Sequence, residues 1–390
     1  MSHRSARILC AVLALVFSLA GSVASQAAET VAVKIPAKFA YVGHYTTPKR
    51  DAETAKGLEV FAIDDKGAWT LIQTVEMLNP SYLAMDSKKR FLYACQGDGT
   101  TVTAFSIDDK TGKLTQLNTA ETTGKNGVHL ALSPDDRFLA VANYSGGTVD
   151  MFAVNADGTL GKRTGSFKSG AKEGVLKSQT GSWPHFVAVT GKYVIAPDKG
   201  HDVVHVLRYD DKTGELTPND PPYMYSRPGT GSRHMSFHPS LPYAYVIEES
   251  DNAITVCTWD AAKGVLTPVQ WVPLVPDTYF YTHRGTGEEG GAAIHVAPSG
   301  DYVYGTQRGL NVIGAFAVDR ATGFLKPVGW ESTQGDRPRF FTFDPSGDVV
   351  FVANQLGDNI AAFSKNKASG KLTLLGDVAR TDCPVCIVFR

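Results

Sequence analysis

Four ionisable side chains of mixed charge are the strongest candidates for chemistry in this chain. They are His185, Arg233, Glu249 and Arg308, which lie far apart in the sequence. A carboxylate between two guanidinium groups acts either as a base or as one partner of a structural ion pair. Each of the four stands beside a predicted β-strand, so the arrangement of the strands decides whether they meet.

The histidine and cysteine spacings indicate neither a metal centre nor a redox centre. The chain has no HxH or HExxH motif. His201 and His205 are four residues apart in a predicted strand, which would separate them by about 13 Å, too far to share an ion. Cys383 and Cys386 form a lone CxxC at a predicted terminal strand, where side chains three apart point to opposite faces. We therefore expect this pair to be structurally incidental, and we expect no metal and no cofactor.

A repeated unit of about 50 residues organises the chain. Each copy has an apolar inner strand, a turn rich in Pro, Asp and Gly, a second strand, and a third strand that commonly ends in Asp or Asn. The second strands begin at Phe39, Phe91, Phe138, Tyr193, Tyr243, Tyr302 and Val349. Their alternating or continuous apolar residues indicate β-structure and not helix. The repeats predict an all-β, seven-bladed β-propeller.

The two ends of the chain are expected to build one blade together. Residues 38–46 have the form of a second strand with no inner strand before it, and residues 384–390 have the form of an inner strand with nothing after it. Pairing of these two segments would close the ring and leave no open sheet edge. The sequence therefore predicts a single domain over residues 28–390.

Strand order predicts which side chains meet at one end of the channel. In an antiparallel pair, the start of the inner strand lies beside the end of the second strand. The second strands end in His44-Tyr45, Gln96-Gly97, Asn143-Tyr144, Asp198-Lys199, Glu248-Glu249, Gln307-Arg308 and Asn354-Gln355, with a polar residue first in every pair. The inner strands begin near His129, His185, Arg233, His234 and Arg339. We expect a small-ligand site there, with His129, Asn143, His234 and Arg339 contacting the ligand.

The first 27 residues have the pattern of a secretory signal peptide. Arg4 and Arg7 precede an apolar run from Ile8 to Ala20, and small residues follow up to Ala28. The run is too short to span a bilayer as a mature helix, and no later stretch is long enough. We expect a periplasmic or secreted protein with no membrane span in its mature form.

The charge balance argues against a nucleic-acid-binding role. The chain has 38 Lys and Arg against 39 Asp and Glu, a formal net charge of −1 at pH 7, which becomes about −3 once Arg4 and Arg7 are removed. Such a chain has no basic field for nucleic acid or an anionic membrane. A small molecule is the expected partner.

Motifs along nearly all of the mature chain support a family assignment. They are 79-NPSYLA, 141-VANYSGGTV, 184-PH, 231-GSRHMSFHPSLPYAYVIEE, 293-AIHVAPSGDYVYGTQRG, 338-PRFFTFDPSG and 353-ANQLGDNIAAF. Taken together they resemble the lactonase family of seven-bladed propellers, which includes propeller-type 6-phosphogluconolactonase and carboxy-muconate lactonizing enzyme. The resemblance implies lactone chemistry, with functional roles for His185, Arg233, Glu249 and Arg308.

Neighbours of those charged residues depart from the family pattern. Ser232, Glu248 and Gln307 stand where that pattern has Pro, Asn and Asn, and Ala293 stands where it has an acid. The substrate is therefore expected to differ from those of the named enzymes. Since 6-phosphogluconolactone is a cytosolic metabolite, an unphosphorylated sugar lactone suits an exported protein better.

Lactone hydrolysis needs a base to activate water and donors to hold the oxyanion that develops on the carbonyl oxygen. Glu249 and His185 are both candidates for the base, and Arg233 and Arg308 are the candidate oxyanion donors. Two alternatives stay open at this point. One is a non-catalytic propeller that binds a ligand or a protein, and the other is an isomerase that forms a lactone.

Overall fold

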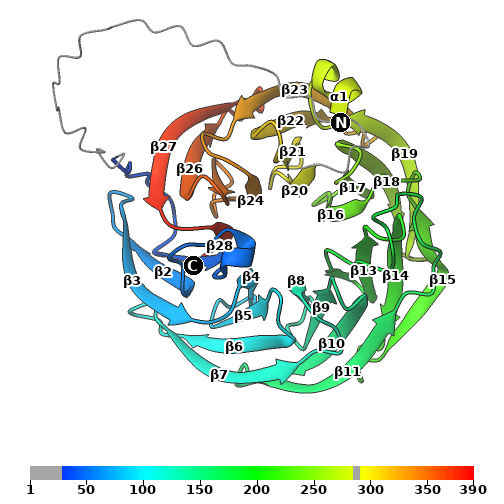
Figure 1. The fold of residues 1–390 in the computed structure, drawn as a ribbon, viewed down its shortest axis with the longest axis horizontal. Coiled ribbons are helices and arrows are strands. Elements are labelled where there is room, and N and C mark those ends of the chain that lie inside the picture. Colours follow the sequence, from blue (N-terminus) through cyan, green and yellow to red (C-terminus); the bar gives the residue numbers. More distant parts are fainter. Residues whose placement is uncertain (1–28, 284–289) are drawn as a thin grey trace, which may run out of the picture.

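The computed structural model describes residues 29–283 and 290–390, which form a ring of seven four-stranded sheets (Figure 1). Neighbouring strands within every sheet are antiparallel, and the sheets are the blades of a propeller. The predicted all-β, seven-bladed fold is confirmed. The predicted signal peptide lies outside the described residues, and no described helix is long and apolar enough to cross a membrane.

The blades are numbered here in chain order. Blade 1 contains β1 (Phe39–His44), β2 (Gly57–Ile63), β3 (Trp69–Glu76) and β28 (Pro384–Phe389). Blade 2 contains β4 (Pro80–Met85), β5 (Phe91–Gln96), β6 (Thr101–Ile107) and β7 (Leu114–Glu121), and blade 3 contains β8 (Gly127–Leu132), β9 (Phe138–Asn143), β10 (Thr148–Val154) and β11 (Leu160–Lys168). Blade 4 contains β12 (Ala188–Thr190), β13 (Tyr193–Asp198), β14 (Val203–Tyr209) and β15 (Leu216–Tyr225), and blade 5 contains β16 (Ser232–Phe237), β17 (Tyr243–Glu248), β18 (Ala253–Asp260) and β19 (Val265–Pro273). Blade 6 contains β20 (Gly291–Val296), β21 (Tyr302–Gln307), β22 (Val312–Val318) and β23 (Leu325–Ser332), and blade 7 contains β24 (Pro338–Phe343), β25 (Val349–Asn354), β26 (Asn359–Lys365) and β27 (Leu372–Arg380).

Burial follows the position of a strand within its blade. The second strands β1, β9, β13 and β21 are buried at every residue, because both of their faces pack against adjacent blades. The outer strands β3 and β7 are mostly half-buried or exposed, and they carry many polar residues. The near-continuous apolar runs in the sequence are therefore central strands of the blades.

A tyrosine in the second strand connects each of several blades to the next. The hydroxyl of Tyr41 donates to the carbonyl oxygen of Gly112 at 2.8 Å, and Tyr93 makes the equivalent bond to Gly158 at 3.0 Å. Gly112 has φ +68°, and a Cβ there would lie 2.3 Å from the ring of Phe39. The Thr-Gly turn recurs because only glycine fits this left-handed backbone against the neighbouring blade.

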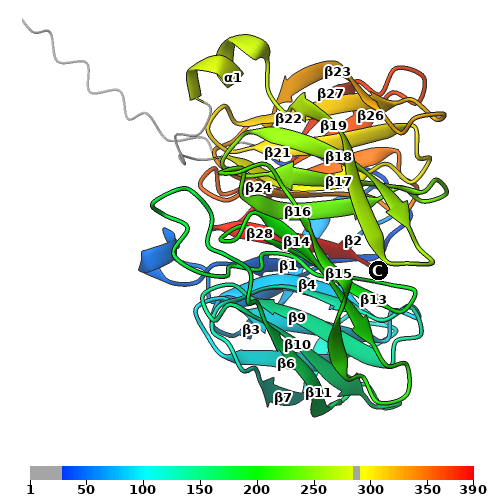
Figure 2. The same ribbon diagram turned by 90° about the vertical axis from the view of Figure 1, so that its right-hand side faces the viewer.

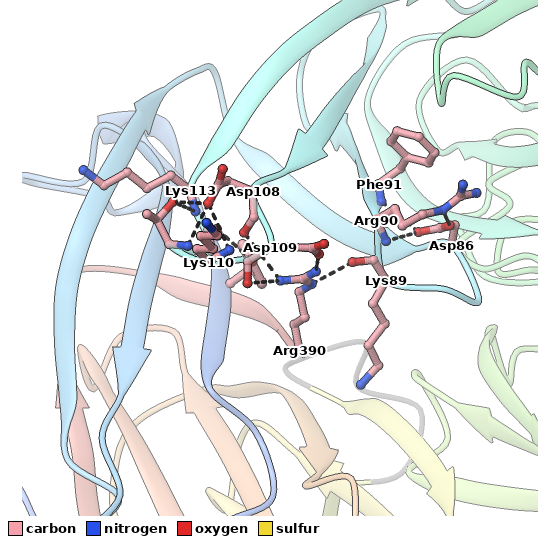
Figure 3. Close-up of polar contacts among 12 residues, drawn as sticks. Asp86, Lys89, Arg90, Phe91, Asp108, Asp109, Lys110, Lys113 and Arg390 are labelled. Carbon is pink, nitrogen blue, oxygen red and sulfur yellow. Dashed lines mark hydrogen bonds and ion pairs between the residues drawn. The ribbon is translucent and has the colours of Figure 1, made fainter.

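The two chain ends close the ring, as the sequence predicts. Strand β1 pairs with β28 in antiparallel register, with Ala40 opposite Phe389 and Val42 opposite Ile387. Figure 3 shows the side chain of the last residue, Arg390, reaching blade 2. Its Nε donates to the carbonyl oxygen of Lys89 at 2.7 Å, and its guanidinium pairs with Asp109. The C-terminal segment thus contacts blade 2 as well as its own blade.

The inner strand of blade 4 is shorter than its sequence suggests. The repeat predicts an inner strand that begins near His185, but β12 covers only three residues, with a single bridge from Pro184 to Asp198 ahead of it. The N–H of Val187 points away from the ladder, to Nδ1 of His129 at 3.3 Å. Two non-strand elements interrupt the repeats, a 3₁₀ turn η1 (Pro48–Arg50) and the helix α1 (Asp277–His283), which lies toward one face of the disk in Figure 2.

Candidate active site

Backbone pairing just past the second strands brings charged residues of three consecutive blades to the same side of the ring. The N–H of Lys199 bonds to the carbonyl oxygen of Trp183 at 3.1 Å, and that of Glu249 bonds to Gly231 at 2.9 Å. Arg308 follows β21 in the same way, and Arg233 is the second residue of β16. Strand order thus places these side chains together, as predicted.

One carboxylate holds three cations at this position. Glu249 Oε1 lies 2.8 Å from Lys199 Nζ and 2.9 Å from Arg308 Nη2, and its Oε2 lies 3.0 Å from Arg233 Nε. The side chains of Arg233 and Arg308 are only 2% and 8% exposed. Arg233 also donates to the carbonyl oxygen of Ala292. We call these four residues the Glu249 cluster; its formal charge is positive.

The cations determine the protonation state of Glu249. Burial by itself would raise the pKa of this carboxyl, but Lys199, Arg308 and Arg233 together outweigh burial and hold the pKa well below its usual value. Burial and the nearby Arg339 lower the pKa of Arg233 to about 9, so this guanidinium is still charged at neutral pH. Glu249 is therefore an ionised carboxylate with little tendency to take up a proton.

His185 is the neutral partner of this charged group. Its ring lies 5.2 Å from that of His234 and 5.3 Å from that of Tyr144, measured between centroids, and its Nδ1 has no hydrogen-bond partner. Burial and the charge of Arg233 lower the pKa of His185 well below its usual value. The imidazole is consequently uncharged at neutral pH, and its Nδ1 is available for a hydrogen bond.

A small cavity joins His185 to the cluster. Its volume is about 10 Å³, and its lining includes His185, Arg233, His234 and Arg339. The guanidinium carbon of Arg339 lies 5.2 Å from the ring centre of Tyr45, which also lines the cavity. Nε2 of His234 is buried and has no hydrogen-bond partner. A cavity of this size, with orphaned ring nitrogens, has room for about one water molecule.

Two predicted ligand contacts do not line this cavity. His129 sits between the rings of Tyr82 and Phe186, at centroid distances of 3.8 and 3.9 Å, and does not line the cavity. Asn143 uses its amide within blade 3, donating to Thr148 at 3.1 Å and to Asp150 at 3.0 Å. The structure therefore gathers His185, Arg233, Glu249, Arg308, His234 and Arg339; the ring of His129 lies 5.6 Å from that of His234 without lining the cavity, and Asn143 is bonded within blade 3.

The polar residue that ends each second strand is hydrogen-bonded within its own blade or to the neighbouring blade. Glu248 accepts a hydrogen bond from Thr255 at 2.8 Å, and Asn354 donates to the carbonyl oxygen of Thr333 at 2.8 Å. The equivalent residues His44, Gln96, Asn143, Asp198 and Gln307 are also hydrogen-bonded in this way. Because successive side chains of a strand point to opposite faces, the next residue of each pair points away from these hydrogen bonds. The ring of first-position polar residues is thus structural.

This alternation also identifies a residue that the sequence reasoning did not assign to the site. Lys199 occupies the same position in its blade as Glu249 and Arg308 in theirs, and it completes the cluster. The signal was present in the aligned strand ends, where Lys199 stands second in its pair, as Glu249 and Arg308 do in theirs.

The expectation that His201 and His205 lie about 13 Å apart is wrong. His201 belongs to the turn before β14, and only His205 is on that strand. The turn folds His201 back, so that its Nδ1 and the Nε2 of His205 both lie within 4.8 Å of each other and of a carboxylate oxygen of Asp198.

The fold and this site define a class: a seven-bladed propeller with a mixed-charge, arginine-rich cluster beside a buried histidine. Residues 39–389 match the family model described as "Lactonase, 7-bladed beta-propeller". The chain belongs to this lactonase family.

Relatives of the chain carry names from lactone metabolism. A 6-phosphogluconolactonase of Bacillus subtilis is 33% identical over 355 residues, which cover 90% of this chain and 97% of the relative. A 6-phosphogluconolactonase of Formosa agariphila is 28% identical, covering 86% and 94%. Among solved structures, the Pseudomonas aeruginosa periplasmic gluconolactonase PpgL superposes with a TM-score of 0.80 at 29% identity, covering 90% of this chain and 98% of that one.

Proposed function

We propose that this protein hydrolyses a sugar lactone at the Glu249 cluster, at one mouth of the propeller channel. The observation that carries the proposal is the pairing of an uncharged histidine, which has a free ring nitrogen, with arginines held in place by one carboxylate. The names of the relatives support lactone hydrolysis as the reaction class.

His185 is the proposed base. A water molecule in the adjacent cavity would give a proton to its imidazole as the water oxygen bonds to the lactone carbonyl carbon. The tetrahedral intermediate then breaks the bond between that carbon and the ring oxygen. The imidazolium returns its proton to the departing alkoxide, and the product is an open-chain hydroxy acid. No residue changes its net protonation over the cycle.

Arg233 and Arg308 are the proposed oxyanion donors. Nε and Nη1 of Arg233 are taken by Glu249 and Ala292, so Nη2 is the atom left for a substrate oxygen. Arg308 uses Nη2 for Glu249 and donates from Nε to Gly290 at 3.2 Å. Removing one such donor commonly costs roughly 3–4 kcal/mol of transition-state stabilisation. Glu249 acts here as a positioning residue that fixes both guanidinium groups.

An unphosphorylated sugar lactone is the proposed substrate, and export is the proposed route of the protein. Residues 1–27 would be removed as a signal peptide, and residues 28–390 would act as one domain in the periplasm or outside the cell. The similarity to the Pseudomonas aeruginosa periplasmic gluconolactonase supports both statements.

Initial rates of acid release by wild type and by two variants, followed in a pH-stat, test this assignment. We expect His185→Gln to lower kcat at least about a hundredfold. Arg233→Lys keeps the charge but loses the planar fork, and we expect a comparable loss. Arg320→Lys is the matched control, because Arg320 is mostly exposed and pairs with Asp301 at 3.1 Å away from the cluster. Near-normal turnover in both site variants would place the chemistry elsewhere.

A further inference from the structure

Blade 4 contains a compact group of three metal-ligating side chains that the proposed hydrolysis does not use. Asp198 Oδ2 lies 3.1 Å from His205 Nε2 and 3.6 Å from His201 Nδ1. All three ligand atoms lie within 4.8 Å of one another, and the exposed fractions of the residues are 0%, 8% and 2% in the order Asp198, His201, His205.

The spacing of these atoms matches a tetrahedral zinc ion. Zinc binds histidine nitrogen at about 2.0–2.1 Å and carboxylate oxygen at about 2.0–2.2 Å, so two ligands of a tetrahedral ion lie about 3.3 Å apart. The two distances from Asp198 lie on either side of this value. Two imidazoles and one carboxylate form a known ligand set for zinc with a fourth position left for water or another oxygen.

The surroundings orient the carboxylate for this purpose. Oδ1 of Asp198 accepts backbone N–H bonds from Trp183 at 2.7 Å, Gly200 at 2.9 Å and His201 at 3.2 Å. These bonds leave Oδ2 directed toward the two imidazoles. Such outer hydrogen bonds are typical of sites whose ligands are held ready for a metal ion.

Two serine hydroxyls form hydrogen bonds with the ligand atoms of His201 and Asp198. Ser169 Oγ lies 2.8 Å from His201 Nδ1, and Ser182 Oγ donates to Asp198 Oδ2 at 2.6 Å. Both are neutral hydrogen bonds that a metal–ligand bond can replace. Ser169 also provides a variant that changes the surroundings of His201 without removing a ligand.

Equivalent positions in other blades show which of these three residues the repeat itself explains. Blades 3 and 5 pair the end of the second strand with the third strand through Asn143–Asp150 at 3.0 Å and Glu248–Thr255 at 2.8 Å. In blade 4, Asp198 and His205 form the equivalent pair between the end of the second strand and the third strand. The positions equivalent to His201 are Gly99, Gly146, Asp251, Leu310 and Gly357. The repeat alone thus gives no reason for His201.

We propose that Asp198, His201 and His205 bind a divalent transition-metal ion, with Zn²⁺ as the best fit. The site goes beyond the proposed hydrolysis and does not depend on it. Lys199 directly follows Asp198 and pairs with Glu249, and Gln179 donates to both the carbonyl oxygen of Lys199, at 2.8 Å, and Asp202, at 2.7 Å. A bound ion would therefore hold the turn that supplies one cation of the Glu249 cluster.

Zinc binding to the untagged full-length chain, measured by isothermal titration calorimetry with zinc chloride, tests the proposal. We expect one equivalent per chain, and a melting temperature that rises with zinc concentration. His201→Ala removes one of three ligands from a turn, and should weaken binding at least about a hundredfold. Ser169→Ala and His238→Ala are controls; His238 hydrogen-bonds to Gly300 at 2.9 Å in another blade.

Each result of the zinc titrations either supports or overturns the proposed metal site. Equal binding by wild type, Ser169→Ala and His238→Ala, with loss in His201→Ala, supports the site. Absence of one-equivalent binding in the wild type overturns it, and so does undiminished binding by His201→Ala. If His201→Ala lacks the circular dichroism spectrum of the wild type, His201→Asn replaces it in the same comparison. Lactone turnover is not a readout here, so failure of this proposal is distinct from failure of the proposed function.

Discussion

Replacing Glu249 with Gln separates the two roles that a carboxylate between arginines can have. The change keeps the size of the side chain and removes its charge. Lys199, Arg308 and Arg233 lie 2.8, 2.9 and 3.0 Å from its oxygens, and each is less than a fifth exposed, at 18%, 8% and 2%. Removing one partner of a buried ion pair commonly costs about 3–5 kcal/mol, because the other charge stays buried without compensation. We expect Glu249→Gln to lower the free energy of unfolding by about this amount.

The kinetic effect of the same change follows from the proposed roles. His185 is intact in Glu249→Gln, so the base is retained while the guanidinium groups lose their alignment. Because the guanidinium groups are the proposed oxyanion donors and also contact the carbonyl oxygen of the bound lactone, we expect kcat to fall and KM to rise together. If Glu249 were the base, kcat would instead fall at least about a hundredfold with the fold intact.

Urea unfolding and initial-rate kinetics on the same preparations measure both effects. Glu121→Gln is the control, since the carboxylate of Glu121 is exposed and accepts a hydrogen bond from Thr100 at 2.8 Å; its unfolding free energy should stay within about 0.5 kcal/mol of wild type. Stability of Glu249→Gln equal to that of the control, together with a large fall in kcat at unchanged KM, would refute the positioning role.

Three further predictions concern stability. Deleting residues 384–390 removes β28 and the contacts of Arg390, and should abolish the folded state by circular dichroism; a soluble product that melts like the parent would contradict ring closure. Burial raises the pKa of Glu248 from 4.5 to about 7, so the folded chain holds this proton more tightly than the unfolded chain does. The free energy of unfolding should therefore fall as pH rises from about 4.5 to about 7, by up to about 3 kcal/mol. Denaturation at pH 5 and pH 8 should show a smaller fall for Glu248→Gln than for wild type. An equal fall in the two proteins would contradict this prediction. Cys383→Ser should leave melting temperature and turnover nearly unchanged, because a hydroxyl keeps the hydrogen bond that Sγ makes to Arg50 at 3.3 Å.

The fold could be predicted from the sequence because the same pattern of strands and turns recurs along the chain. Each blade carries the same apolar second strand and the same turn glycine, and the unpaired strands at the two chain ends allow one closure. Blade 4 departs from the pattern for a reason outside its own segment. The ladder there is interrupted where His129 of another blade accepts the N–H of Val187. A contact between blades of this kind has no local signature.

The site could be predicted only as far as backbone topology determines it. Strand order was enough to bring Arg233, Glu249 and Arg308 together. It did not show which of two adjacent side chains joins the cluster, and so Asn143 was assigned to the ligand while Lys199 was not. The geometry of the turn at His201 could not be predicted from the sequence either. The position of His201 depends on a turn whose backbone N–H groups bond to Asp198.

The central claim is that the Glu249 cluster and His185 hydrolyse a sugar lactone, and the most direct measurement is acid release by the wild-type protein. A pH-stat at neutral pH, with a panel of unphosphorylated and phosphorylated sugar lactones and the spontaneous rate subtracted, gives the initial rate for each. We expect a rate proportional to protein concentration, larger for an unphosphorylated lactone, and lost in Arg233→Ala. No hydrolysis of any lactone above the spontaneous rate would contradict the claim and favour a propeller that only binds its ligand.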